Sequence, residues 1–237
     1  MSARMHLLLA VTLAVASTQP ALSQPNPYSV ASKAVQIAQA REHNAALMHQ
    51  YQWNSRTELV VKGEVKDIRI ELVNYGPSGQ LQRVVLNDQA ATLHTLPTPI
   101  GFLRRAIAKN EKEEMQKYLT GLRDLLEQYT LPTTGKIMDF MMSATPTGPD
   151  AQGMIQMTGH NVVQPGDTLN MWVNPWTKHV THIQVSTTFQ GDAVQLTATF
   201  ATVPSSGLSY VSFAEVTVSA KQINVQVQNY NYARLSY

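Results

Sequence analysis

One strictly alternating segment, residues 66–75, constrains the fold of this chain more than any other. Its apolar members are Ile68, Ile70 and Leu72, and every residue between them is charged. A period of two is typical of a β-strand with one buried face and one solvated face. We therefore expect an antiparallel sheet in this region, with the apolar side of the strand directed toward helices.

The residues on either side extend this strand into a meander. Residues 58–62 precede it and residues 81–86 follow it with the β-branched and aliphatic side chains that strands favour. The second connection is Gly76-Pro77-Ser78-Gly79, a composition typical of a tight turn. The sequence predicts three consecutive antiparallel strands within residues 56–87.

A second block rich in strand patterns follows a loop at residues 144–150. Short connections such as Pro165-Gly166-Asp167 and Gln190-Gly191-Asp192 separate its segments, which favours antiparallel pairing. The expected strands are residues 154–157, 169–173, 180–189, 193–200, 211–218 and 223–232. We expect this block to complete the sheet that residues 56–87 begin.

Helical spacing occurs in three places. Residues 30–51 carry a narrow face of small apolar side chains, and residues 100–129 carry the longest stripe at intervals of three and four. A shorter helix is expected at residues 135–142, so residues near 99–142 form a helical insertion. The predicted fold is α+β: a single curved antiparallel sheet, an incomplete barrel, with helices packed on its concave face. Residues 24–237 are expected to form one domain.

Residues 1–23 have the layout of a secretory signal peptide. A positive charge at Arg4 precedes the apolar run 7–16, and Ala21-Leu22-Ser23 places small residues before the expected cleavage site. Cleavage after Ala16 and retention as an N-terminal membrane anchor are the alternatives. The chain has no cysteine, which excludes disulfides, thiol catalysis and a lipid-modified cysteine. The expected location is periplasmic or secreted, in a bacterium.

The charge of the chain indicates no polyanionic partner. Its formal net charge is +2 and charged residues make up 14% of it, without a dense cluster of Lys and Arg. Nucleic-acid binding depends on neutralising several phosphates, so it is not expected. After removal of the signal no segment approaches the length of a transmembrane helix.

Motifs for catalysis and metal binding are absent from the sequence. The seven histidines have no zinc-type spacing, and His179 and His182 fall on opposite sides of an expected strand. There is no Gly-x-Ser-x-Gly elbow and no phosphate-binding loop. We expect no cofactor, no metal site and no enzymatic activity; a hydrolase has the least support.

Aromatic and methionine side chains are the best candidates for a binding site. A concave sheet lined by them, beneath a helix rich in methionine, would form an adaptable apolar pocket, although an ordinary packed core uses the same residues. The candidate ligand-binding residues are Trp53, Ile68, Ile70, Leu72, Met138, Met141, Trp172, Phe189 and Phe200.

The order of elements, together with residues 169–178 leading into 182–185, resembles the lipoprotein-carrier superfamily (the LolA/LolB-like fold). In that family a strand ends in Asp/Asn-Pro-x-Thr and returns as an apolar strand, as Asn174-Pro175-Trp176-Thr177 does here. Residues 56–86 are similar to an uncharacterised exported bacterial branch. The resemblance implies a periplasmic protein with a cavity for acyl chains. The family's functional arginine has no matching position in this chain, and the helix at residues 100–129 departs from the family pattern.

The sequence therefore supports two hypotheses of different class. The first is non-enzymatic binding of a lipid or another apolar or acyl-bearing ligand in a cavity between sheet and helices. The second is a structural or protein-interaction domain of the cell envelope, with a packed core, an envelope protein as partner and no small ligand.

Overall fold

The computed structural model describes residues 27–86, 93–94, 109–130 and 133–235. The predicted signal peptide and the first part of the helix predicted at residues 100–129 lie outside these ranges. All strands in the described residues belong to one antiparallel sheet of 11 strands, in the order β4-β3-β2-β1-β11-β10-β9-β8-β7-β6-β5. The sheet has two edges, β4 and β5, so it does not close into a barrel, and the predicted α+β class is confirmed.

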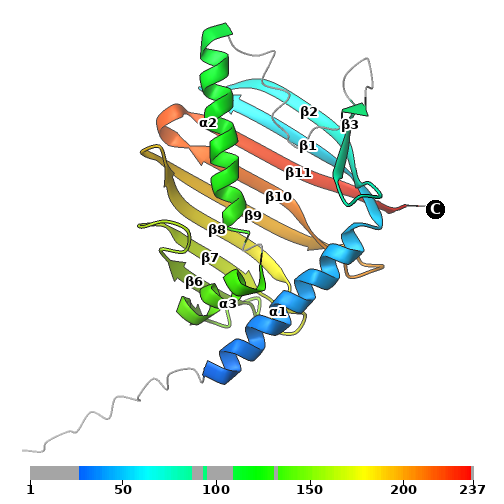
Figure 1. Cartoon of the computed structure of the whole chain (residues 1–237), viewed down its shortest axis with the longest axis vertical. Helices are drawn as coiled ribbons and strands as arrows, with labels where there is room; N and C mark the ends of the chain where they lie inside the picture. The colour runs from blue at the N-terminus through cyan, green and yellow to red at the C-terminus, as the bar shows by residue number, and fades with distance from the viewer. Residues whose placement is uncertain (1–26, 87–92, 95–108, 131–132, 236–237) are drawn as a thin grey trace, which may run out of the picture.

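The strands follow one another along the sheet in two runs. The first run is β1 (Tyr51–Val61), β2 (Glu64–Tyr75), β3 (Leu81–Val85) and β4 (Leu93–His94). The second is β5 (Thr145–Thr147), β6 (Ile155–His160), β7 (Thr168–Val173), β8 (Val180–Phe189), β9 (Asp192–Thr202), β10 (Ser209–Val218) and β11 (Ile223–Arg234). The two runs join where β1 pairs with β11, as expected for a sheet that the second block completes (Figure 1).

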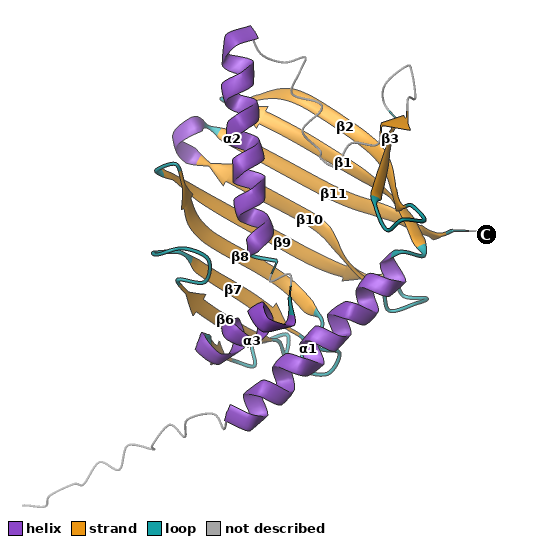
Figure 2. Ribbon diagram, in the orientation of Figure 1, coloured by secondary structure: helices purple, strands orange, loops and turns teal. Residues whose placement is uncertain are grey.

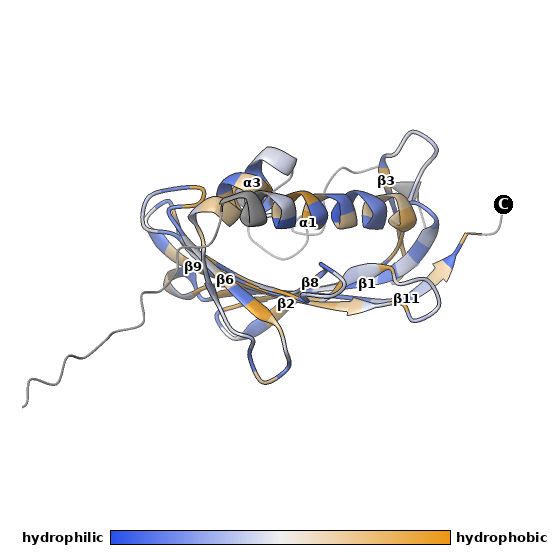
Figure 3. Cartoon of the chain, turned by 90° about the horizontal axis from the view of Figure 1, so that it is seen from below, coloured by the Kyte–Doolittle hydropathy of each residue, from blue (hydrophilic) through white to orange (hydrophobic). Residues whose placement is uncertain are grey.

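Three helices lie over one face of this sheet. They are α1 (Pro27–Met48), α2 (Lys109–Gln128) and α3 (Thr134–Ser143) (Figure 2). Seen along the sheet, the strands curve around the helices, which occupy the concave side (Figure 3). We call this side the helix face and the opposite side the back face. A 3-10 turn, η2 (Ser219–Lys221), connects β10 to β11.

The first helix ends earlier, and the first strand begins earlier, than the sequence predicted. Tyr51 was expected at the end of the helix, but it begins β1, whose side chains alternate between buried and partly buried along its whole length. Gln52 between Tyr51 and Trp53, and Asn54 after Trp53, give this segment a period of two. The apolar spacing of the helix is compatible with Tyr51, so the prediction overran the boundary.

Hydrogen bonds from α1 fasten it to distant parts of the chain. The Asn44 amide donates to the Ser209 carbonyl at 2.7 Å and accepts from the Ser209 backbone N–H at 2.7 Å. Arg41 Nη1 donates to the carbonyl of Thr130 at 2.6 Å. These contacts hold α1 across the start of β10 and next to the end of α2.

The strand register shows that β2 is oriented opposite to the prediction. Leu59 packs against α2, and it pairs directly with Asp67, so Asp67 is on the helix face. Because side chains alternate along the strand, Arg69 and Glu71 share that face. Ile68, Ile70 and Leu72 therefore lie on the back face. The alternation was predicted correctly, but the apolar side does not face the helices.

Candidate functional site

The helices are packed directly on the sheet at two places. Phe140 of α3 lies over Gly159 of β6, where an added Cβ would come within 2.6 Å of the ring. Gly121 of α2 lies over Phe189 of β8, where a Cβ would come within 2.7 Å of Cζ. The backbone and the aromatic ring approach each other at both sites only because glycine has no side chain. The space beneath these two points is therefore filled.

Two hydrophobic clusters surround these contacts. The first joins α1 and α3 to β6, β7 and β8 and includes Ile37, Phe140, Met157, Leu169 and Val185. The second joins α2 to β1, β9, β10 and β11 and includes Leu59, Leu122, Val194, Val218 and Ile223. Some side chains of the helix face belong to neither cluster, and these residues form the candidate site.

One row of cross-strand neighbours crosses the whole helix face and passes through the candidate site. Paired residues on adjacent strands share a face, so the row can be followed from strand to strand. Its members are Met157, Met171, Ile183, Ala198, Ala214, Val227, Thr57 and Arg69. The side chains change along this row from large and apolar, through two alanines and a valine, to a hydroxyl and then a guanidinium.

The middle of this row has the shortest side chains. Ala198, Ala214 and Val227 are in neither hydrophobic cluster, and Ala214 and Val227 are only partly buried. We call these three residues the central floor. Beside it, Phe200 shares the helix face with Ala198, since the two are two residues apart on β9. An apolar surface with low side chains thus lies between the first cluster and Thr57, outside the two clusters that the helices cover.

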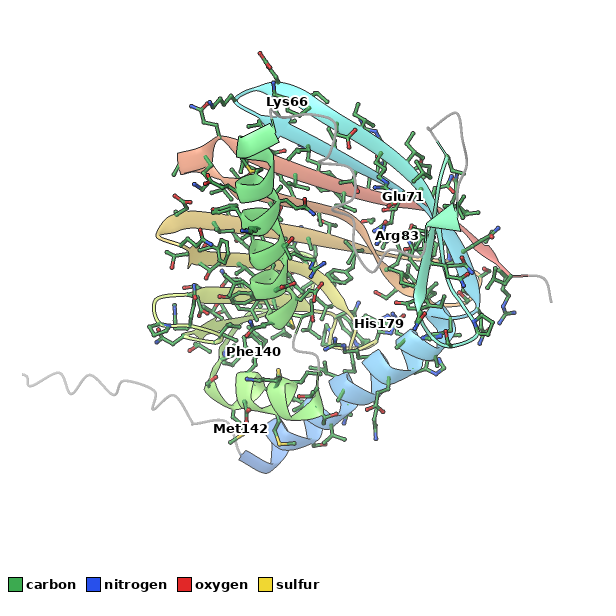
Figure 4. The ribbon with its side chains drawn as sticks, turned by 45° about the horizontal axis from the view of Figure 1, so that its top comes forward. Lys66, Glu71, Arg83, Phe140, Met142 and His179 are labelled. Carbon is green, nitrogen blue, oxygen red and sulfur yellow. The ribbon has the colours of Figure 1, made fainter. Side chains whose placement is uncertain are left out.

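The charged end of the row is a buried ionic cluster on β2 and β3. Glu71 is 1% exposed; its Oε1 lies 2.8 Å from Arg69 Nε, and its Oε2 accepts a hydrogen bond from Arg83 Nη1 at 2.8 Å (Figure 4). The Arg69 contact is an ion pair without a hydrogen bond, since Arg69 Nε is buried and donates to no acceptor among the described residues. Asp67, on the same face, is engaged in an interaction of its own. Two guanidinium groups therefore share one carboxylate.

A run of aromatic rings borders the candidate site near the end of α1. Trp53 of β1 is 7% exposed and stacks on Tyr232 of β11, with 5.4 Å between ring centroids. Tyr75 lies 6.0 Å from Trp53 on one side, and Tyr210 lies 4.0 Å from Tyr232 on the other. Burial, with smaller contributions from Tyr210 and Tyr75, raises the pKa of Tyr232, so its hydroxyl is neutral at physiological pH.

Two tyrosines, one in α2 and one in the turn that follows it, form connections to carboxylates at the sheet. Tyr118 donates to Asp192 Oδ2 at 2.9 Å, and Lys221 lies over the Tyr118 ring at 4.8 Å. At the other end of the helix, the Tyr129 hydroxyl donates to Asp167 Oδ2 at 2.7 Å and lies 2.8 Å from Thr187 Oγ1. Burial raises the pKa of Tyr118, and the neighbouring carboxylate of Asp192 raises it further.

Asp167 is the centre of the second of these connections. Its carboxylate accepts hydrogen bonds from the backbone N–H groups of Val162, Val163 and Gln164 at 2.6–2.9 Å. Burial alone would raise the pKa of Asp167, but the bonds from Tyr129 and from these backbone groups outweigh it, and the pKa is lowered. The charged carboxylate thus organises the loop between β6 and β7 and secures the end of α2.

The structure divides the nine candidate residues between the two faces. On the helix face, Met138 and Met141 pack in the first cluster, Phe189 packs against the second, and Trp53 and Phe200 border the central floor. A ligand-binding role for these five stays a prediction. Ile68, Ile70 and Leu72 lie on the back face, and so does Trp172, whose ring meets that of His182. These four cannot line a space beneath the helices.

The sequence analysis did not single out the residues that distinguish the candidate site. Ala214 and Val227 are inconspicuous small apolar residues, and Thr57 is one of many hydroxyl residues in the strands. Arg69 and Glu71 were assigned to the solvated face of their strand. The one available signal was that Arg69 and Glu71 lie on one expected strand and Arg83 on the next. A tight turn between two such strands brings opposite charges within reach of one another.

Other kinds of site have little basis in the described residues. Within them no group of three or more His, Asp or Glu side chains is placed to hold a metal ion. None of the helices there combines the length and hydropathy required to cross a membrane. His182 has a lowered pKa because it is partly buried, and His179 because of burial and the nearby His43.

Comparison with solved structures finds proteins with the same general architecture. The chain is similar to a putative outer membrane lipoprotein-sorting protein domain from Vibrio parahaemolyticus (10% identity, 87% of this chain and 94% of that one, TM-score 0.46). It is also similar to a DUF1329 family protein from Desulfovibrio piger (9% identity, 88% and 94%, TM-score 0.40). A third match is a LolA superfamily protein from Nitrosomonas europaea (10% identity, 90% and 96%, TM-score 0.36).

Two of these structures are named for the LolA superfamily or for lipoprotein sorting. With identities of 9–10% and TM-scores below 0.5 the three matches carry no argument about a ligand, a partner or a compartment. No protein-family model matches the chain. No curated protein matches it either.

Proposed function

We propose that this chain is an exported cell-envelope protein that binds an apolar or acyl-bearing ligand, without catalysis, between the sheet and its helices. Export is supported by the signal-like residues 1–23. The observation that carries the proposal is the row of side chains across the helix face, in which the low central floor lies between the first cluster and the polar end formed by Thr57 and Arg69. The apolar part of a ligand would lie over Ala214 and Val227.

The chemistry of the row favours a ligand with two unlike ends. Apolar surface removed from water stabilises a complex by about 25 cal/mol per Å². At the other end of the row, Thr57 supplies a hydroxyl and Arg69 a guanidinium, which prefer polar or anionic groups. An acyl chain with a polar head matches both parts of this surface. A wholly apolar ligand would leave the charged end unused.

The three tryptophans provide a direct test. Trp53 borders the central floor, Trp172 lies on the back face, and Trp176 is 76% exposed in the β7–β8 turn. Bromine on an acyl chain quenches only fluorophores that it contacts. We expect a brominated fatty acid to quench the variant that retains Trp53 alone (Trp172→Phe, Trp176→Phe). The matched variant that retains Trp172 alone should not be quenched.

A second test asks whether the central floor is covered by packed side chains. If a ligand occupies this space, Ala214→Leu fills it, so fatty-acid binding falls at least tenfold while the melting temperature is nearly unchanged. In a packed core the same change costs about 1–3 kcal/mol of stability. Ala193→Leu, at an exposed position of β9, is the control for added hydrophobicity.

The alternative, a structural or protein-interaction domain, predicts different results from both tests. Its core would be filled, so Ala214→Leu would destabilise the protein and no brominated lipid would quench Trp53. Native mass spectrometry of protein purified from the exporting host adds an independent result. A mass equal to that of the polypeptide, unchanged by added fatty acid, would contradict ligand binding.

A further inference from the structure

The back face of the sheet carries an apolar surface at one end. Along β2 and the end of β3, aliphatic side chains project away from the helices. They are Val65, Ile68, Ile70, Leu72, Val84 and Leu86, which we call the back strip. Val65 is 53% exposed, Leu86 48% and Ile68 38%. Exposed aliphatic residues usually occur singly on a protein surface, whereas these lie side by side.

The rest of the back face has a different composition. On β6 to β9 it presents hydroxyl and amide groups that bond to one another, such as Thr158 to Asn170 at 2.7 Å and Ser186 to Gln195 at 2.8 Å. The back face also carries two aromatic residues elsewhere, Trp172 of β7 and Phe213 of β10, but its exposed aliphatic side chains are concentrated on the end formed by β2 and β3. Contiguous exposed apolar surface of this kind marks an interaction site.

The charges around the back strip are balanced. Arg56 and Glu58 lie on the back face of β1, opposite Ile70 and Ile68, and form an ion pair with each other. Lys66 and Glu64 form a second pair at the β1–β2 turn, but Glu64 pairs with Val61 of the second cluster and so lies on the helix face. The border on β1 thus has one positive and one negative side chain, with no net charge. A surface that binds an anionic membrane would carry an excess of basic residues. A surface that binds a strongly charged protein would carry an excess of the charge opposite to that of its partner.

We propose that the back strip is the contact surface between two copies of this chain. A two-fold axis places the same patch of both copies face to face, so it suits a surface that is apolar in the centre and carries both charges at its border. The axis would bring Arg56 of each copy toward Glu58 of the other. Aliphatic sheet faces stack in this way at about 10 Å in β-sandwiches.

The size of the back strip indicates a reversible dimer. With the border on β1 included, three strands spaced by about 4.8 Å and about eight residues of about 3.3 Å each give a projected area of roughly 380 Å² per copy. A standard stable interface buries about 800 Å² per partner. Association is therefore expected to depend on concentration, with the dimer forming at high micromolar concentrations.

Sedimentation velocity of the mature chain from 5 to 500 µM (about two decades of concentration) tests this proposal. We expect the weight-average mass to rise toward that of a dimer, and Ile68→Glu to lower the association constant at least tenfold. The matched control is Gln195→Glu, which puts the same charge on the polar part of the back face and should leave association unchanged. Circular dichroism verifies that both variants remain folded.

A charge-swap experiment distinguishes a specific dimer from general adhesion. Arg56→Glu makes the border negative and Glu58→Arg makes it positive, so each variant alone should be monomeric. An equimolar mixture of the two should recover association. A mixture that stays monomeric, or a wild-type chain that is monomeric at 500 µM, overturns the proposal.

A different occupant would produce its own result. Flotation with neutral phosphatidylcholine vesicles that carries the wild type but not Ile68→Glu would assign the back strip to a lipid surface instead. That outcome would also overturn the dimer. Neither experiment involves the helix face, so a failure here leaves the proposed ligand site untouched, and the reverse is also true.

Discussion

The two ends of the sheet have opposite polarity. On β6 to β8 the helix face is apolar and packs against α1 and α3, whereas the back face carries hydroxyl and amide groups. On β2 and β3 the helix face carries Arg69, Glu71 and Arg83, whereas the back face carries aliphatic residues. Each strand alternates correctly by itself, but the apolar side changes from one face to the other across the sheet.

This difference shows what covers each region. An apolar side chain is buried only where another element lies over it, and the first cluster places α1 and α3 over β6, β7 and β8. The change of polarity occurs at β1 and β11, where Thr57 pairs with Val227. A residue such as threonine, with one methyl and one hydroxyl, fits either environment. The central floor adjoins this boundary, which is why a ligand there would meet both kinds of surface.

The largest effect is expected from neutralising the charged end of the helix face. Glu71→Gln leaves two arginines with no carboxylate, and breaking a buried ion pair from one side costs about 3–5 kcal/mol. Urea denaturation should show this loss. The control is Glu58→Gln, in the partly exposed pair on the back face, which should cost about 1 kcal/mol or less. Equal losses in the two variants would contradict the comparison between the faces.

Overpacking the apolar end should have the next largest effect. Gly159→Ala places a Cβ 2.6 Å from the ring of Phe140, which is 2% exposed, and 3.0 Å from Val162. The buried Phe140 ring has no free space to move into, so a loss of about 3 kcal/mol is expected in thermal and urea unfolding.

Gly121→Ala is the informative companion of that variant. Its Cβ would meet only the tip of the partly buried Phe189 ring, and alanine in a helix gains about 1 kcal/mol over glycine. The two terms should nearly cancel. A larger loss at Gly121 than at Gly159 would show that α2, and not α3, is the more rigidly packed helix.

The connection at Asp167 should cause a moderate, pH-dependent effect. The pKa of Asp167 is lowered in the folded protein, so its contribution is present above the ordinary carboxylate pKa of about 3.9 and disappears as the pH falls through the lower folded value. Asp167→Asn replaces an acceptor with a donor opposite backbone N–H groups and should cost about 2 kcal/mol at pH 7.

The pH dependence provides the control for that prediction. Below pH 4 the wild type loses this stabilisation, so the difference in unfolding free energy between wild type and Asp167→Asn should become smaller. Tyr129→Phe, which removes the hydroxyl and leaves the carboxylate in place, should cost about 1 kcal/mol. A difference that is constant from pH 7 to pH 3 would refute the role given to the charged carboxylate.

The smallest effect is expected on the polar part of the back face. Ser186→Ala removes an exposed hydrogen bond to Gln195 and should change the unfolding free energy by less than about 0.5 kcal/mol. A loss above 1 kcal/mol would indicate that this face is covered in the native protein.

The sequence predicted the architecture more fully than the site, for a physical reason. Alternation in residues 66–75 and in β8 and β9 is a local property, so the strands, their antiparallel pairing and the α+β class followed from it. The face that each side chain occupies depends on which helices lie above it. Arg69 and Glu71 look solvated by their charge, and only the register with Leu59 places them beside the core.

The residues of the central floor could not be predicted for a related reason. Ala198, Ala214 and Val227 come from three consecutive strands, and which of their residues meet depends on the register between β9, β10 and β11. A small side chain becomes significant when the residues around it pack under helices and it belongs to neither cluster. Trp53 could be singled out from the sequence because a tryptophan in an alternating segment stands out without knowledge of its partners, and its role in binding stays a prediction.

The pairing of β1 with β11 also determines when this molecule can acquire its shape. Glu58 and Gln226 are cross-strand neighbours although about 170 residues separate them. Bringing the ends of so long a segment together costs roughly 4–5 kcal/mol of chain entropy. A ribosome delivers β11 after the other described strands, so β1 waits without its second neighbour until β11 has been synthesised. Until then β1 is an open edge, and a chaperone that protects such edges is a natural companion for the nascent chain.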